Sequence, residues 1–149
     1  MEDLTLDVCV LMSGSSISDS NTNRKYGKMS FDLMTRMMAD DRYFLALDSR
    51  KKIETQYLKR LNPQTFGHSF VRQMASMGKT VTVQWQEINR GVRVKLEERG
   101  FTRNDEDYGF VVVASGSCCK KLITHERHFF GVARILNSIG LAVLLPNQA

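Results

Sequence analysis

Short runs of apolar residues alternate along this chain with segments in which apolar residues recur at helical spacing. The runs cover residues 4–11, 43–47, 80–83, 121–124 and 141–145, of which 80–83 fits either a strand or an extended connection. Alternation of strands and helices favours parallel strands in one sheet with helices on both faces. We therefore expect an α/β fold: a three-layer sandwich with a mostly parallel central sheet of four or five strands.

Helical spacing and capping residues predict the segments between the strands. Helices are expected from Ser30 as an N-cap, after Asp48 and Ser49, and over residues 66–77, 85–98 and 129–138. Residues 13–28 show no helical period and predict a long loop. Residues 108–114 fit either a helix, because acidic residues precede them, or a strand, because they are rich in valine.

Length and composition set the class of protein. At 149 residues the chain has the size of one domain, residues 1–149, and 42% hydrophobic with 25% charged residues is ordinary for a globular protein. No stretch approaches the roughly 20 apolar residues of a membrane helix, and the N-terminus lacks signal-peptide features. Three cysteines, two of them adjacent, make no disulfide framework. These features predict a cytoplasmic protein without a membrane partner.

The chain is basic, with a net charge of +5, which favours a polyanionic partner such as a nucleic acid. Many of its cations lie near the loops that are predicted to carry a site. They form either an electrostatic rim around a site or an ordinary solvated surface. They are Arg24, Lys25, Lys28, Arg50, Lys51, Lys52, Arg103, Lys120, Lys121 and Arg127.

Asp7 is the one acid inside the first apolar run. A buried carboxylate costs several kcal/mol unless a cation or a hydrogen-bond donor meets it. Two interpretations follow. The carboxylate either belongs to a metal site or accepts hydrogen bonds from amides of the following loop.

Four further acids lie close to predicted strand ends or helix starts. Glu54 is on the helix after the second strand, Asp105 and Asp107 precede residues 108–114, and Glu126 follows residues 121–124 by two positions. In a parallel sheet such positions converge beyond the carboxyl ends of the strands. Neighbouring carboxylates repel unless a cation lies among them, and oxygen ligands suit Mg²⁺ or Mn²⁺.

Taken in order, these positions resemble the motifs of the PIN domain family. Residues 6–13, LDVCVLMS, resemble an apolar strand ending in Asp-x-Asn-x-Leu with a serine soon after. Ser49 with Glu54, then Asp107, resemble the second and third motifs. Residues 122–126, LITHE, followed by Phe129, resemble the Thr-x-Asp element and its aromatic residue, and 140–146 resembles the last strand. Two positions depart from the pattern: Cys9 replaces the asparagine and Glu126 the final aspartate.

The resemblance implies a metal-dependent endoribonuclease, in which Mg²⁺ or Mn²⁺ activates water to hydrolyse RNA. Asp7, Glu54 and Asp107 would be direct or water-mediated ligands, Asp105 the alternative for the third position, and Glu126 would complete the acidic pocket. Ser13 and Thr124 would hydrogen-bond the carboxylates or position the phosphate, with Arg127 and Lys120 at the substrate. Small basic members of the family act as toxins or in RNA processing, so the expected partners are RNA and an antitoxin or another protein, with a homodimer also open.

Two other functions remain open. Cys9 and Glu126 also suit a catalytically weakened PIN-like module that binds RNA or protein. A doubly wound regulatory or nucleotide-binding domain is the third interpretation, although the chain has no GxGxxG or GxxxxGKS loop.

Overall fold

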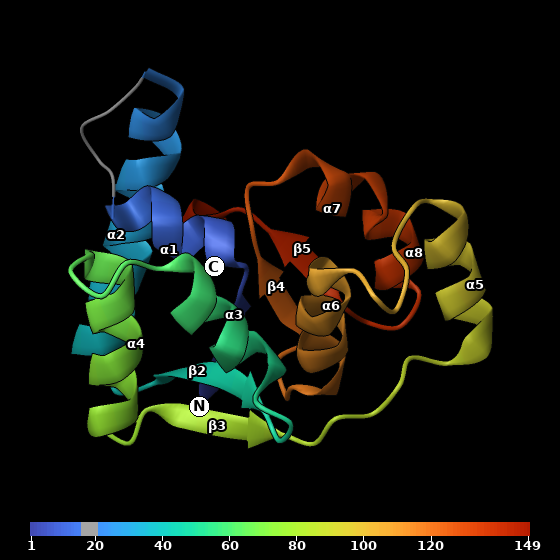
Figure 1. Cartoon of the computed structure of the whole chain (residues 1–149), viewed down its shortest axis with the longest axis horizontal. Coiled ribbons are helices and arrows are strands. Elements are labelled where there is room, and N and C mark those ends of the chain that lie inside the picture. Colours follow the sequence, from blue (N-terminus) through green and yellow to red (C-terminus); the bar gives the residue numbers. More distant parts are fainter. Residues whose placement is uncertain (16–20) are drawn as a thin grey trace.

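The computed structural model describes residues 1–15 and 21–149, with only the backbone for residues 21–24. In this part of the chain, five strands form one parallel sheet: β1 (Glu2–Leu6), β2 (Tyr43–Asp48), β3 (Thr80–Val83), β4 (Lys121–Ile123) and β5 (Ala142–Leu144). Their order across the sheet is β3-β2-β1-β4-β5, so β1 is central. Figure 1 labels the other four strands. The expected α/β fold with a parallel central sheet is confirmed, and residues 80–83 form a strand.

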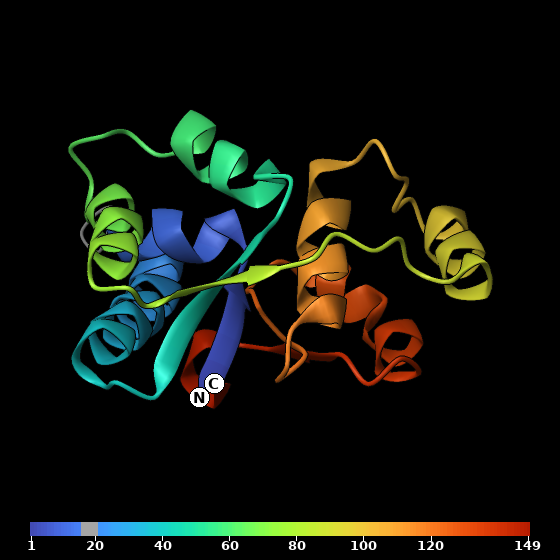
Figure 2. The ribbon, with the colours of Figure 1, turned by 90° about the horizontal axis from the view of Figure 1, so that it is seen from below.

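Helices cover both faces of this sheet. On one side lie α1 (Val8–Ser15), α2 (Asn21–Ala39) and α4 (Phe66–Ser76), and on the other lie α6 (Glu106–Gly116), α7 (Arg127–Gly131) and α8 (Ala133–Asn137) (Figure 2). The remaining elements are α3 (Lys52–Arg60), α5 (Arg90–Glu98) and the short 3₁₀ helix η1 (Pro146–Gln148). Among the described helices, none combines the length and the apolar character needed to cross a bilayer.

The segment that fitted either a helix or a strand is helix α6. Residues 108–114 are all buried, because the helix packs on β1, β2 and β4 and also against α3. A helix buried on every side is apolar all round and shows no amphipathic period. Its start is specified locally, since the Asp105 carboxylate accepts a hydrogen bond from the Asp107 amide at 3.0 Å.

The first apolar run is a strand followed by a helix, so the prediction of one strand over residues 4–11 was wrong. β1 ends at Leu6, α1 begins at Val8, and Asp7 lies between them. The predicted loop over 13–28 was wrong as well, because 13–15 belong to α1 and 21–28 to α2; residues 16–20 are outside the described part. Ser30 is no N-cap but lies inside α2, where its Oγ is 2.8 Å from Ser13 Oγ.

Two other helices differ from the prediction in their bounds. The helix expected over 85–98 begins only at Arg90, because the Asn89 side chain caps it by accepting from the Val92 amide. The helix expected over 129–138 is divided into α7 and α8 at Val132. The N-cap residue of α3 is Lys51 rather than Asp48 or Ser49, but the Asp48 carboxylate accepts the backbone amides of Arg50 and of the first two helical residues, Lys52 and Ile53.

Candidate active site

A cavity of about 450 Å³ lies at the carboxyl end of the sheet, between α1, α3, α6 and the connection from β4 to α7. Three predicted acids line it from separate segments: Asp7 after β1, Asp107 in the first turn of α6, and Glu126 after β4. The other lining residues come from the same elements. They are Val8, Cys9, Met12, Ser13, Gln56, Arg60, Glu106, Phe110, His125 and His128.

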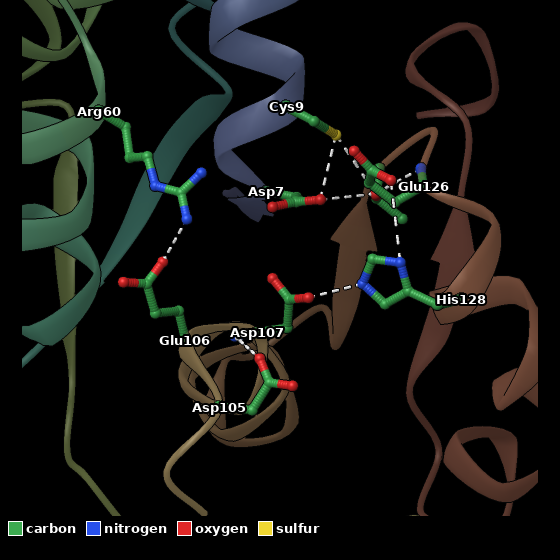
Figure 3. Close-up of polar contacts among 9 residues, drawn as sticks. Asp7, Cys9, Arg60, Asp105, Glu106, Asp107, Glu126 and His128 are labelled. Atoms are coloured by element: carbon green, nitrogen blue, oxygen red, sulfur yellow. Dashed lines mark hydrogen bonds and ion pairs between the residues drawn. The ribbon is translucent and has the colours of Figure 1, made fainter. Parts of the chain in front are cut away.

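Asp7 is almost completely buried, with an exposed fraction of 2%. Its Oδ2 accepts hydrogen bonds from Thr124 Oγ1 at 2.8 Å and from Cys9 Sγ at 3.0 Å (Figure 3). Burial raises the pKa of the carboxyl, the two hydrogen bonds lower it, and the negative charges of Asp107 and Glu126 raise it again, with a net increase. The group is therefore held in one orientation in an environment that disfavours its charge.

Asp107 and Glu126 are linked by His128. The His128 Nε2 lies 2.6 Å from Asp107 Oδ2, and its Nδ1 lies 3.8 Å from Glu126 Oε2 (Figure 3). Partial burial raises the pKa of Asp107, against the opposing effect of the His128 hydrogen bond. Asp105 is exposed, caps α6 and is not among the residues that line this cavity.

Thr124 follows β4, and its hydroxyl connects this strand end to Asp7 at the end of β1. This is the predicted hydrogen bond from Thr124 to a carboxylate. Besides donating to Asp7, its Oγ1 accepts from the Glu126 amide at 3.0 Å. The side chain is fully buried and does not line the cavity, so it orients the acids without reaching a ligand. Ser13 does line the cavity, and its Oγ is 3.1 Å from His125 Nε2.

Glu54 does not join these acids. Helix α3 instead turns Gln56 and Arg60 toward the cavity. Buried Ile53 and Tyr57 fix the rotation of α3, and residues three or four positions apart share a helix face, which puts 53, 56, 57 and 60 together. This periodicity was present in the sequence and indicates residues 56 and 60 in preference to 54.

Sequence reasoning also missed the ion pair that forms one wall of the cavity. Arg60 Nη2 lies 2.6 Å from Glu106 Oε2, and Lys59 Nζ lies 3.5 Å from Glu106 Oε1. Figure 3 shows the Arg60 guanidinium on the opposite side of the open space from His128. No local pattern links these residues, because α3 and α6 are far apart in sequence.

The two predicted substrate-binding cations do not line the cavity. Lys120 immediately precedes β4 and lies at the amino end of the sheet, opposite Asp7, because all strands run in the same direction; its placement at the site was wrong. Lys121, at the same end, pairs with Glu2. Arg127 is exposed at the start of α7, next to Glu126. The side chain of Arg24 is outside the described part.

The donor chemistry of the cavity fits Mg²⁺ or Mn²⁺. Asp7 and Asp107 both use Oδ2 for the hydrogen bonds described, and their other oxygens face the open space in Figure 3. In the part of the chain described, no three Asp, Glu, His or Cys side chains are gathered as a ready-made metal cluster. Mg²⁺ commonly keeps several waters and is held by one or two carboxylates, which these two oxygens would provide.

Comparisons of the chain with protein-family models, with curated proteins and with solved structures found no match. The PIN-type resemblance therefore stays a prediction from the motifs.

Proposed function

We propose that this protein is a metal-dependent nuclease that hydrolyses phosphodiester bonds in RNA. The observation that carries the proposal is the meeting of Asp7, Asp107 and Glu126, from three separate segments, at one cavity beyond the carboxyl ends of the strands. The environment raises the pKa of Asp7 and of Asp107, as is common for groups at functional sites. A net charge of +5 suits a polyanionic substrate.

In this proposal Asp7 and Asp107 hold Mg²⁺ or Mn²⁺ directly or through water, and Glu126 completes the acidic wall. The bound ion would lower the pKa of a coordinated water and stabilise negative charge on the phosphate. Thr124 and Cys9 fix the orientation of the Asp7 carboxylate, and His128 fixes that of Asp107. Arg60 is half-exposed, so its guanidinium can exchange Glu106 for a phosphate oxygen.

Cleavage assays with matched variants test the proposal. Purified protein is incubated with single-stranded and structured RNA in Mn²⁺ or Mg²⁺, beside Asp7→Asn and Asp107→Asn. We expect cleavage by the wild type and background levels for both variants, because each loses a charged ligand. Asp32→Asn, an exposed change on α2, is the control and should cut normally. RNA left equally intact by wild type and Asp7→Asn would contradict the proposal.

One observation favours the alternative of a catalytically weakened module that binds RNA or protein. Two internal contacts, the His128–Asp107 hydrogen bond and the Arg60–Glu106 ion pair, occupy polar groups of the cavity. A metal titration separates the two functions, since a ligand that binds only the native state raises the melting temperature. A rise with Mn²⁺ in the wild type, absent in Asp7→Asn, supports the nuclease; no rise in either supports the module.

A further inference from the structure

A second cavity, of about 280 Å³, adjoins the proposed active site. Gln56 and Glu106 line both cavities, so the two are neighbours across α3 and α6. The second one is also lined by an indole ring, Trp85, and by two cationic side chains, Lys52 and Arg103. Two acids, Asp105 and Glu106, also line it, so the second cavity combines an aromatic ring with charges of both signs.

Trp85 is held in place by its neighbours. Its backbone amide donates to Ser49 Oγ at 3.1 Å, which ties the segment after β3 to the end of β2. Its indole Nε1 donates to Glu87 Oε1 at 3.4 Å, and the Tyr108 hydroxyl donates to the other oxygen of Glu87 at 2.9 Å. The half-buried ring is thus pre-oriented, which reduces the entropy lost when a planar group stacks on it.

Exposed cations surround this ring. Lys52 Nζ lies 4.8 Å and Arg50 Cζ 5.6 Å from its centre. Both side chains are exposed and can leave the ring for an incoming phosphate. Glu106, which lies between the cavities, is paired with Arg60 and Lys59, so its charge does not repel a polyanion strongly.

We propose that this second cavity, the Trp85 subsite, binds one unpaired base of the RNA strand next to the phosphodiester in the active site. The base stacks on Trp85, and Lys52 and Arg103 contact the flanking phosphates, as aromatic rings and cations do in proteins that bind single strands. The position of the scissile bond rests on the proposed nuclease function, but binding of the base does not. Bases inside a duplex are already stacked and cannot enter, so the subsite selects single-stranded RNA.

Tryptophan fluorescence tests the subsite directly, because Trp85 is the only tryptophan in the chain. The full chain is titrated in EDTA, to prevent cleavage, with an RNA oligonucleotide of about eight nucleotides. The single strand should quench the emission, and a duplex of the same length should not. No quenching by the single strand, or equal quenching by the duplex, would overturn the proposal.

Variants measured with fluorescently labelled RNA extend the test. Trp85→Leu should weaken binding about tenfold through loss of one stack, and Trp85→Phe should recover most of it. Arg103→Ala should weaken binding and reduce its salt dependence by about one phosphate contact, whereas Arg72→Ala, an exposed change on α4, should do neither. Unfolding curves verify that each variant is folded. If Trp85→Leu is unfolded, RNA binding by Trp85→Phe and the fluorescence quenching of the wild type still decide whether the subsite binds a base.

The two proposals can fail separately. Cleavage by the wild type with no contribution from Trp85 overturns the subsite and leaves the nuclease. Quenching by single strands without cleavage in any metal overturns the nuclease and leaves the subsite.

Discussion

Asp7 is a residue whose burial works against stability. Its carboxylate is removed from water and lies near the negative charges of Asp107 and Glu126. Two hydrogen bonds, from Thr124 and Cys9, offset only part of this cost, because the net effect is a raised pKa. A buried carboxylate in an environment that disfavours its charge is typical of functional sites.

We therefore expect Asp7→Asn to stabilise the metal-free protein. A carboxyl whose pKa is raised in the folded state binds more protons there than in the unfolded chain, so wild-type stability falls as the pH rises from the ordinary value of 3.8 through the folded pKa. The advantage of the asparagine variant should be small near pH 4 and grow with pH, by about 1.4 kcal/mol for each unit of pKa difference. Urea unfolding in EDTA at several pH values measures it. Lower stability of the variant at neutral pH would contradict the stated cost.

Residue-scale prediction succeeded where the chemistry is local. An acid in an apolar run requires compensation wherever the run folds, which is why Asp7 could be singled out. Thr124 was linked to the carboxylates by the resemblance of residues 122–126 to the Thr-x-Asp element. The choice of Gln56 and Arg60 over Glu54 depends on which face of α3 is buried, and the buried Ile53 and Tyr57 indicate that face only when the helical phase is followed.

At the scale of elements, α1 shows why one apolar run became a strand and a helix. It packs against α2 and α4, and Cys9, Val10, Leu11, Ser13 and Gly14 are buried. With so many positions buried, the helix lacks the alternation of apolar and polar faces that marks a surface helix. Helix α1 also lies very close to α4: the backbone amide of Gly67 on α4 donates a hydrogen bond to Ser15 Oγ at the end of α1, at 2.7 Å.

This close approach predicts the effect of a single methyl group. A Cβ at residue 67 would lie 2.5 Å from the Leu11 carbonyl oxygen and 2.8 Å from Ser15 Oγ. Gly67→Ala should therefore destabilise the protein by about 1–3 kcal/mol through overpacking, despite the better helix propensity of alanine. Gly91→Ala on α5 is the matched control, because its Cβ would meet only Asn89 Oδ1 at 3.5 Å. The free energy of unfolding of Gly91→Ala should equal that of the wild type or exceed it by up to about 1 kcal/mol. An equal loss of stability in Gly67→Ala and Gly91→Ala, measured by urea unfolding, would argue against the close contact.

The whole molecule has two different ends, because the strands of its sheet are parallel. Two buried acids mark these ends: Asp3 lies near the start of β1, and Asp7 directly follows its last residue. The two oxygens of Asp3 accept the backbone amides of Cys118 and Cys119, each at 2.8 Å, and tie the turn before β4 to β1. The amino end thus uses its buried acid for structure, whereas the carboxyl end holds the cavity.

Substitution at the two ends should have opposite consequences. Asp3→Asn puts an amide NH₂ against one of the backbone donors and should lower the free energy of unfolding by about 1–3 kcal/mol. The cleavage activity proposed for the protein, measured where Asp3→Asn is fully folded, should remain that of the wild type, whereas Asp7→Asn should lose this activity without losing stability. Urea unfolding and cleavage assays on both proteins make the comparison. A large loss of activity in folded Asp3→Asn would show that the two ends are coupled.

The sequence by itself determined the α/β class, the approximate positions of β2, β4 and β5, and three acids that line the cavity, Asp7, Asp107 and Glu126. These follow from local properties: strand-length apolar runs, helix caps and the cost of burying a carboxylate. Only the tertiary structure decided that residues 8–15 are helical, that Arg60 pairs with Glu106, and that Trp85 lies beside Lys52. Each of these depends on contacts between segments distant in sequence, and such contacts exist only once the sheet and its two helical layers have formed.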